Sequence, residues 1–208
     1  MKKRGALQEP EIVRTTSAPN PVELPKDLPC PVDDGLCDHL TGMALPNLSL
    51  TSTTELACNL SLLQGRVVMY LYPMTGKPGV PLSEGWLQIP GAPGCTPQSC
   101  AFRDHADELR QYNCSVFGIS TQSSEDQREA VARLHLPYEL LSDAEFKLTE
   151  ALRLPTFVVE GKRMIKRQTW IVEVGKIIKV FYPVFPPERN ASDVIAWLDG
   201  KREAMCQS

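Results

Sequence analysis

Cys95 is the residue whose setting in this 208-residue chain is best suited to chemistry. It stands in PGCTPQSC, directly before a segment with helical periodicity. At the start of a helix several backbone N–H groups lack partners, and the helix dipole contributes about half a positive charge. This setting favours the thiolate, the nucleophilic form of cysteine. We therefore expect Cys95 to be a nucleophile, with Gly94 allowing a substrate to approach closely. The alternative, an inert buried cysteine, is disfavoured because the flanking PG and TP pairs supply no apolar neighbours.

Cys100 lies five residues after Cys95, inside the expected helix. In a regular helix this separation means about 7.5 Å of rise and about 140° of rotation. A disulfide needs Cα atoms within about 7 Å of each other, so bonding between the two cysteines requires the first turns of the helix to unwind. The alternative is that Cys100 only packs within the helix. His105 is expected on a solvated helix face and not as a catalytic base, because an ionised cysteine needs no separate base.

The other five cysteines have no partner that the sequence reveals. Cys30 and Cys37 lie in CPVDDGLC, and we interpret them as exposed thiols because no second pair of metal ligands is nearby. Cys58 and Cys114 are expected in the core or in strands, and Cys206 in a tail. An odd number of cysteines predicts free thiols in a reducing compartment, the cytoplasm.

The composition disfavours several classes of partner. The formal net charge of −3 disfavours strong electrostatic attraction to nucleic acid or to an anionic membrane. No apolar stretch approaches the roughly 18 to 20 residues of a membrane span, and MKKRGALQEPEIV lacks the apolar core of a secretory signal. We expect a small soluble substrate.

The segments around Cys95 predict an α/β fold. Residues 66–73, RVVMYLYP, are typical of a central strand, and residues 114–121, CSVFGIST, of a second buried strand. The helical segment between them has Thr96 as its expected cap and Pro97 in its first turn. Strands alternating with helices are typical of the α/β class.

Later segments predict further helices and strands. Two pairs have the pattern of a capping box: Ser124 with Gln127, and Ser142 with Glu145. TFVVEG, RQTWIVEVG and KIIKVFYPV predict antiparallel strands, the last two joined at Gly175. A final helix is expected from Ser192 to Gly200.

The chain is expected to have three parts. Residues 1–44, rich in proline and polar turn-forming residues, predict an irregular or disordered N-terminal arm. Residues 45–200 form the folded domain, and residues 201–208 a C-terminal tail. Within the domain, residues 74–91 form a long loop dense in Gly and Pro, which we expect to wall the substrate pocket with Trp86 as its apolar anchor.

The stretch GCTPQSCAFRDHADEL, after a strand ending in Tyr72 and Pro73, resembles the active-site segment of the bacterioferritin-comigratory (Q-type) branch of the AhpC/TSA-like peroxiredoxins. The resemblance extends from about Leu45 to Gly200, with FGIST, LLSD and RQTWIVEVGKI following in the family's order. It implies a thioredoxin-like fold, a central mixed β-sheet flanked by helices.

The resemblance also implies roles for individual residues. Cys95 matches the cysteine that attacks the peroxide and becomes a sulfenic acid, and Cys100 matches the cysteine that resolves it to an intrachain disulfide. Arg167 matches the arginine near the thiolate, and its rigid fork of N–H donors suits a developing negative charge. From the residues alone, an exposed strand charge beside Lys162, Arg163 and Lys166 is an equally good interpretation of Arg167. Pro73, Gly94 and Thr96 are expected to contact the substrate.

The implied activity is a thiol-dependent peroxidase acting on hydrogen peroxide and organic hydroperoxides. The resemblance implies no metal, flavin or haem cofactor. It implies a thioredoxin-like dithiol protein as the reductant. We expect a monomer or weak dimer.

One position departs from the family pattern, which reads Pro, three residues, Thr or Ser, two residues, Cys. Ala92 stands where the hydroxyl residue is expected, and the 74–91 loop separates Pro73 from Cys95. Thr75, Thr96 or a backbone group in the loop replaces the hydroxyl, or the enzyme is slower or acts on another oxidant. The alternative function is therefore a thioredoxin-fold thiol switch or oxidoreductase without efficient peroxidase activity. A structural module with inert cysteines is a third reading.

Overall fold

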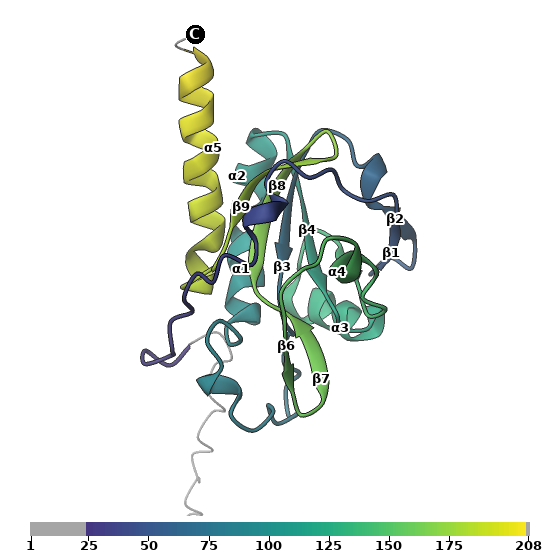
Figure 1. Ribbon diagram of the computed structural model, residues 1–208, viewed down its shortest axis with the longest axis vertical. Helices are drawn as coiled ribbons and strands as arrows, with labels where there is room; N and C mark the ends of the chain where they lie inside the picture. The colour runs from purple at the N-terminus through teal and green to yellow at the C-terminus, as the bar shows by residue number, and fades with distance from the viewer. Residues whose placement is uncertain (1–23, 207–208) are drawn as a thin grey trace, which may run out of the picture.

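A seven-stranded mixed sheet forms the centre of the molecule. The computed structural model describes residues 24–206, and the strands lie in the order β2-β1-β5-β4-β3-β8-β9. Their bounds are β1 Ser49–Ser52, β2 Ala57–Asn59, β3 Arg66–Leu71, β4 Cys114–Ser120, β5 Leu140–Ser142, β8 Gln168–Glu173 and β9 Lys176–Phe181. Strand β3 pairs in parallel with β4 and antiparallel with β8 (Figure 1). The two predicted buried strands are confirmed.

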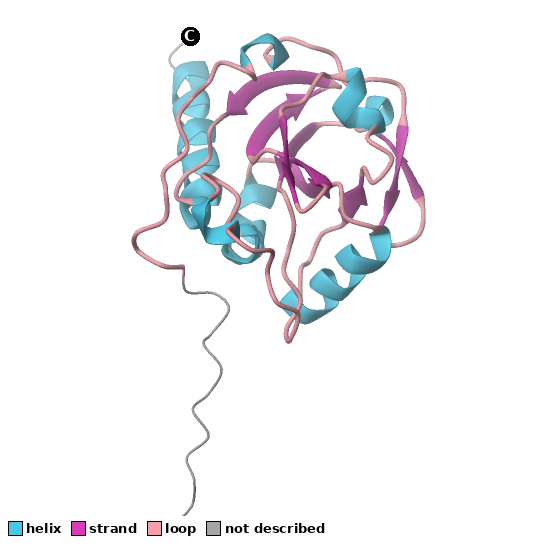
Figure 2. Cartoon of the chain, turned by 60° about the horizontal axis from the view of Figure 1, so that its bottom comes forward, coloured by secondary structure: helices cyan, strands magenta, loops and turns pink. Residues whose placement is uncertain are grey.

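Two apolar cores lie on opposite faces of this sheet, because the side chains of a strand alternate between faces. Val68 and Tyr70 belong to one core, with residues of four helices. These are α1 Cys95–Asp104, α2 Ala106–Gln111, α3 Ser124–Leu134 and α5 Asn190–Cys206. Val67 and Met69 belong to the other core, which includes α4, Lys147–Ala151. Figure 2 shows helices on both sides of the sheet, so the predicted α/β class is confirmed.

The C-terminal half contains one more hairpin than predicted. TFVVEG forms β6, Thr156–Val159, and it pairs with β7, Lys162–Ile165, in a separate two-stranded sheet. Strands β8 and β9 form the predicted antiparallel pair. Strand β7 was missed because KRMI carries two charged residues that face solvent.

The helix termini differ from the predicted capping boxes. Helix α3 is capped by Ser123, whose Oγ accepts a hydrogen bond from the N–H of Asp126 at 3.1 Å. Helix α4 is preceded by Asp143, whose buried carboxylate accepts from the N–H groups of Leu148 and Thr149 at 2.9 Å each. The predicted boxes at Ser124 with Gln127 and at Ser142 with Glu145 are therefore wrong.

Two further helix boundaries need correction. Helix α1 begins at Cys95 after Gly94, so Thr96 is not its cap. Helix α5 begins at Asn190 and continues through Gly200 to Cys206, because a glycine inside a helix only weakens it. Residues 201–206 thus belong to this helix, which projects beyond the body in Figure 1.

Part of the N-terminal arm is packed against the domain. Cys37 and Leu40 are buried in the second core, and Ala44 forms a β-bridge with Lys176. The expectation that Cys37 is an exposed thiol is therefore wrong, whereas Cys30 is exposed. Residues 1–23 and 207–208 and the Cys206 side chain lie outside the described part of the chain.

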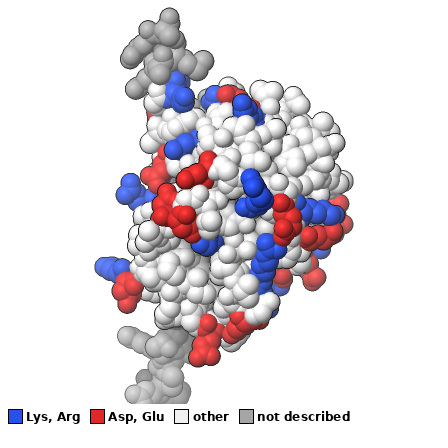
Figure 3. Space-filling model, in the orientation of Figure 1, with Lys and Arg blue, Asp and Glu red and all other residues white. Residues whose placement is uncertain are grey.

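Short 3-10 helices complete the fold at Asp38–Leu40, Leu60–Leu62, Trp86–Gln88 and Pro187–Arg189. Figure 3 shows acidic and basic side chains interspersed on the face drawn. Among the described residues, no helix combines the length and apolar character needed to span a membrane.

Candidate active site

Cys95 is the first residue of α1, and its side chain is buried with 3% exposure. The chain turns into the helix at Gly94, whose φ of 102° is a conformation that favours glycine. A Cβ at Gly94 would overlap Pro187 and lie 3.0 Å from Leu24 Cδ1. The close approach that we expected from a substrate at Gly94 is therefore made by Pro187 and Leu24.

Arg167 lies between the turn before Cys95 and the sulfur itself. Its Nε donates to the carbonyl of Gly91 at 3.1 Å. Its Nη2 lies 3.0 Å from the carbonyl oxygens of both Ala92 and Pro93, and 3.1 Å from Cys95 Sγ. The guanidinium is only 3% exposed, so its charge faces these groups rather than water.

The Arg167 guanidinium lacks a carboxylate partner. No ion pair formed by the described residues includes it. A buried cation without a counter-ion is costly, and neutral carbonyl groups compensate only part of that cost. Among the described residues, Cys95 Sγ is the only hydrogen-bond partner of this cation that can become an anion.

A buried chain of hydrogen bonds fixes the other side of the guanidinium. Arg167 Nη1 donates to Gln98 Oε1, and Gln98 Nε2 donates to Asn190 Oδ1 at 2.9 Å. The same oxygen accepts from Thr169 Oγ1 at 2.6 Å. This network links α1, β8 and the first residue of α5.

The roles of Gln98, Asn190 and Thr169 were not predicted from the sequence. Gln98 carried a usable signal, because residues three apart lie on the same face of a helix and Gln98 is three residues after Cys95. Asn190 and Thr169 carried no sequence signal, since the contact between them depends on how α5 returns to the sheet.

Ala92 turns its carbonyl rather than its side chain toward the site. The carbonyl accepts from Arg167 Nη2 at 3.0 Å and from the Cys95 thiol at 3.6 Å. The methyl group belongs to a small apolar cluster with Trp86, Val159 and Met164. The position that carries a hydroxyl in the family pattern therefore contributes to packing here.

The two threonines considered as replacements have different surroundings. Thr75 is buried, and both its N–H and its hydroxyl donate to Gln122 Oε1, at 2.7 and 3.2 Å. Thr96 is half-buried in the first turn of α1, next to Cys95. The hydroxyl of Thr75 is thus already hydrogen-bonded to Gln122, and Thr96 is the better candidate to replace the family's hydroxyl.

Cys100 is buried in α1 and is not bonded to Cys95, since both are free thiols. Burial raises the pKa of the Cys100 thiol, although Arg103 and Arg133 oppose the shift. The neighbouring turn is fixed by tyrosines, because Tyr70 donates to Ser99 Oγ at 3.1 Å and Tyr138 donates to the Ser99 carbonyl at 2.8 Å. In this conformation Cys100 is a neutral thiol held inside the core.

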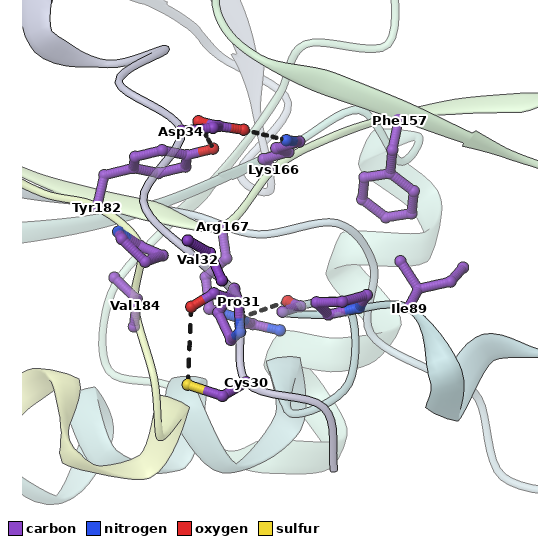
Figure 4. A pocket seen from close by; sticks show the side chains of 13 residues that line it. Cys30, Pro31, Val32, Asp34, Ile89, Phe157, Lys166, Arg167, Tyr182 and Val184 are labelled. Atoms are coloured by element: carbon purple, nitrogen blue, oxygen red, sulfur yellow. Dashed lines mark hydrogen bonds and ion pairs between the residues drawn. The ribbon is translucent and has the colours of Figure 1, made fainter.

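A cavity of about 410 Å³ lies beside Arg167 (Figure 4). The 74–91 loop supplies one wall through Ile89 and Gly91, and Phe157 of β6 supplies another. Trp86 anchors this loop, since its side chain is buried and its ring centroid lies 6.2 Å from that of Phe157. The third wall, missed in the sequence analysis, is made by residues 30–34 of the arm and by residues 182–184.

The remaining predicted site residues lie away from this cavity. Pro73 is buried, and its carbonyl accepts from Ser120 Oγ at 2.9 Å. His105 is partly exposed between α1 and α2 and pairs with Glu108 at 2.9 Å. No group of three potential metal ligands occurs in the described part of the chain.

Comparison with known proteins places the site within one sequence family. The model of the AhpC/TSA family matches residues 87–181. The chain is 29% identical over 156 residues to a chloroplastic peroxiredoxin Q of Oryza sativa subsp. japonica, covering 74% of this chain and 64% of that protein. It is 27% identical over 159 residues to a chloroplastic peroxiredoxin Q of Sedum lineare, covering 76% of each. The chain thus spans less than two thirds of the length of the rice relative.

Solved structures share the fold. Peroxidoxin BcpB from Mycobacterium tuberculosis has a TM-score of 0.62 at 28% identity, covering 77% of this chain and 96% of that one. A peroxiredoxin Q from Xylella fastidiosa has a TM-score of 0.63 at 20% identity, covering 78% and 96%. These likenesses confirm the predicted thioredoxin-like fold.

Proposed function

This chain belongs to the AhpC/TSA family, and from that premise we propose that it is a thiol-dependent peroxidase. Its substrates are hydrogen peroxide and organic hydroperoxides. Cys95 is the attacking residue, Cys100 resolves the product, and Arg167 stabilises the reacting sulfur and oxygen.

One observation carries this proposal: the contact of 3.1 Å between Arg167 Nη2 and Cys95 Sγ. Both groups are buried, and the guanidinium lacks a carboxylate partner among the described residues. A sulfur beside such a cation is favoured as the thiolate, which is the form that attacks a peroxide.

In the proposed reaction the Cys95 thiolate attacks one oxygen of the hydroperoxide. The O–O bond breaks, the sulfur becomes a sulfenic acid, and the other oxygen leaves as water or an alcohol after taking up a proton. Arg167 N–H groups stabilise the negative charge that moves onto the leaving oxygen. Of the three residues expected to contact the substrate, this proposal keeps Thr96, because Pro73 lies away from the cavity and Pro187 and Leu24 pack against Gly94.

Cys100 then resolves the sulfenic acid to an intrachain disulfide and releases water. Its buried, neutral state requires the start of α1 to open first, because the two cysteines lie in one continuous helix. A dithiol protein of the thioredoxin kind restores both thiols by exchange.

The cavity beside Arg167 supports the inclusion of organic hydroperoxides. It has a volume of about 410 Å³, and Ile89, Phe157 and Val184 contribute apolar walls. Such walls suit the hydrocarbon part of a substrate whose peroxide group reaches the guanidinium.

Ala92 favours a second candidate function, a thiol switch that exchanges disulfides but reduces peroxides slowly. The methyl group of Ala92 cannot orient a peroxide by hydrogen bonding.

The proposed location is the cytoplasm, where thiols remain reduced. The six cysteines within the described residues are free thiols. The rice and Sedum relatives are chloroplastic proteins. The proposed assembly state is a monomer or weak dimer.

Stopped-flow oxidation of the reduced protein by hydrogen peroxide tests the proposal. Wild type should react orders of magnitude faster than a free thiol, and Cys95→Ser should abolish the reaction. Cys100→Ser should form the sulfenic acid but no Cys95–Cys100 disulfide, and Cys58→Ser, at an edge strand, should behave as wild type. A wild-type rate equal to that of free cysteine, with disulfide exchange intact, would establish the thiol switch instead.

A further inference from the structure

The N-terminal arm runs along the loop that leads into Cys95. Leu24 lies against Gly94, since a Cβ there would be 3.0 Å from Leu24 Cδ1. Pro31 lies against Gly91, with its side chain 3.5 Å from the equivalent Cβ position. Residues 24–31 therefore lie across the turn that carries the reactive sulfur.

Cys30 lies within this crossing segment and is exposed. Together with Arg167 it lines the cavity beside the site (Figure 4). The Nη2 atom of the same guanidinium lies 3.1 Å from Cys95 Sγ. One exposed thiol thus lines the same cavity as Arg167, the residue that contacts the Cys95 sulfur.

The arm is anchored on one side of Cys30 and loosely held on the other. Asp34 pairs with Lys166 at 2.6 Å and accepts from Tyr182 Oη at 2.7 Å. Within residues 24–32, the described structure shows no hydrogen bond to the rest of the domain. Four residues of extended chain span up to about 14 Å, which is the reach of Cys30 from Asp34 once the apolar contacts of Leu24 and Pro31 open.

The two candidate resolving thiols therefore differ in what they require. Cys100 is buried, and its pKa is raised by that burial, so its reaction depends on opening α1. Cys30 is exposed and needs only movement of an irregular segment, which costs less than unwinding a packed helix.

We propose that Cys30 is a second resolving cysteine for the sulfenic acid of Cys95, an inference that rests on the proposed peroxidase function. The Cys30 sulfur attacks the Cys95 sulfur, an S–S bond forms and the S–O bond breaks. The hydroxide leaves as water with the proton of the Cys30 thiol, so the sulfenic acid is reduced and the Cys30 thiol is oxidised. The resulting disulfide ties the arm across the mouth of the cavity until a dithiol protein reduces it.

The test uses the full-length protein with Cys100→Ser, which removes the other resolving thiol. The reduced protein receives one equivalent of hydrogen peroxide, dimedone traps sulfenic acid at successive times, and non-reducing peptide mapping identifies disulfides. Two matched variants add Cys30→Ser or Cys58→Ser to the same background.

In Cys100→Ser we expect a short-lived sulfenic acid and a Cys30–Cys95 disulfide whose rate is independent of protein concentration. Adding Cys30→Ser should make the sulfenic acid persist, and adding Cys58→Ser should change nothing. A persistent sulfenic acid in Cys100→Ser without the Cys30–Cys95 peptide, or a disulfide formed only between chains, overturns the inference alone. Failure of every variant to form a sulfenic acid overturns the peroxidase proposal and the inference with it.

Discussion

Arg167 Nη2 lies 3.1 Å from Cys95 Sγ, although the two residues are 72 positions apart in the chain. The guanidinium is buried, and its other partners are backbone carbonyls and one amide oxygen. Among the described residues, Cys95 Sγ is therefore the only partner of this cation that can become an anion. In the proposed mechanism this contact joins the stability of the site to its reactivity.

Replacement of Arg167 by lysine should lower the rate of peroxide reduction about 100-fold, a loss typical of removing one preorganised donor to the reacting oxygen. Lysine keeps the charge but lacks the planar fork that reaches the loop carbonyls and the sulfur together. Stopped-flow oxidation measures the effect, with Arg163→Lys in the exposed part of β7 as the control. Equal rates for Arg167→Lys and wild type would show that charge alone is sufficient.

Asn190 and Thr169 should be energetically coupled through their hydrogen bond of 2.6 Å. Asn190→Ala leaves a buried Gln98 amide and a Thr169 hydroxyl without their shared acceptor, which should cost about 1–3 kcal/mol of unfolding free energy. Urea denaturation of Asn190→Ala, Thr169→Val and the double variant measures the coupling. Strict additivity would contradict a shared network.

Strands β3, β4, β8 and β9 and the position of Cys95 at the start of a helix could be predicted from the sequence, because they depend on local pattern. The run of apolar residues in 66–73 identified β3, and the motif around Cys95 identified the start of α1. The arginine at 167 required the resemblance to a family, since an exposed strand charge was an equally good reading of the residues alone.

The long-range parts of the site could not be predicted in this way. Asn190 reaches Gln98 only because α5 returns to the sheet, and Cys37 is buried only because the arm folds back onto the second core. Ala92 was recognised as a departure, but the direction of its methyl group depends on the inserted loop and β6. Such contacts between distant segments have no local sequence signal.

Restoring the family's hydroxyl by Ala92→Thr should not accelerate peroxide reduction. The methyl group is buried in the cluster with Trp86, Val159 and Met164, so a larger side chain should cost about 1–3 kcal/mol of unfolding free energy through overpacking. Ala92→Val is the matched control, because valine has the shape of threonine without its hydroxyl. A threonine variant faster than both wild type and Ala92→Val would show that the hydroxyl can reach the peroxide.

The unfolding free energy should decrease as the pH rises above about 8.5, the pKa of a free cysteine thiol. Burial raises the pKa of Cys37 to about 12 and that of Cys114 to about 11. Below the unfolded-state value these thiols are protonated in both states, and their contribution to stability is fully present. Above it the unfolded chain loses protons that the folded chain retains, so each thiol lowers stability by up to about 1.4 kcal/mol per pH unit until its folded pKa is reached.

Urea denaturation under reducing conditions between pH 8 and 9.5 measures this slope, with values chosen to stay below the ionisation of the tyrosines. Cys114→Ala should make the slope shallower, whereas Cys30→Ala, at an exposed position, should leave it unchanged. A slope that is the same in Cys114→Ala and wild type would show that the buried thiol does not contribute to the pH dependence.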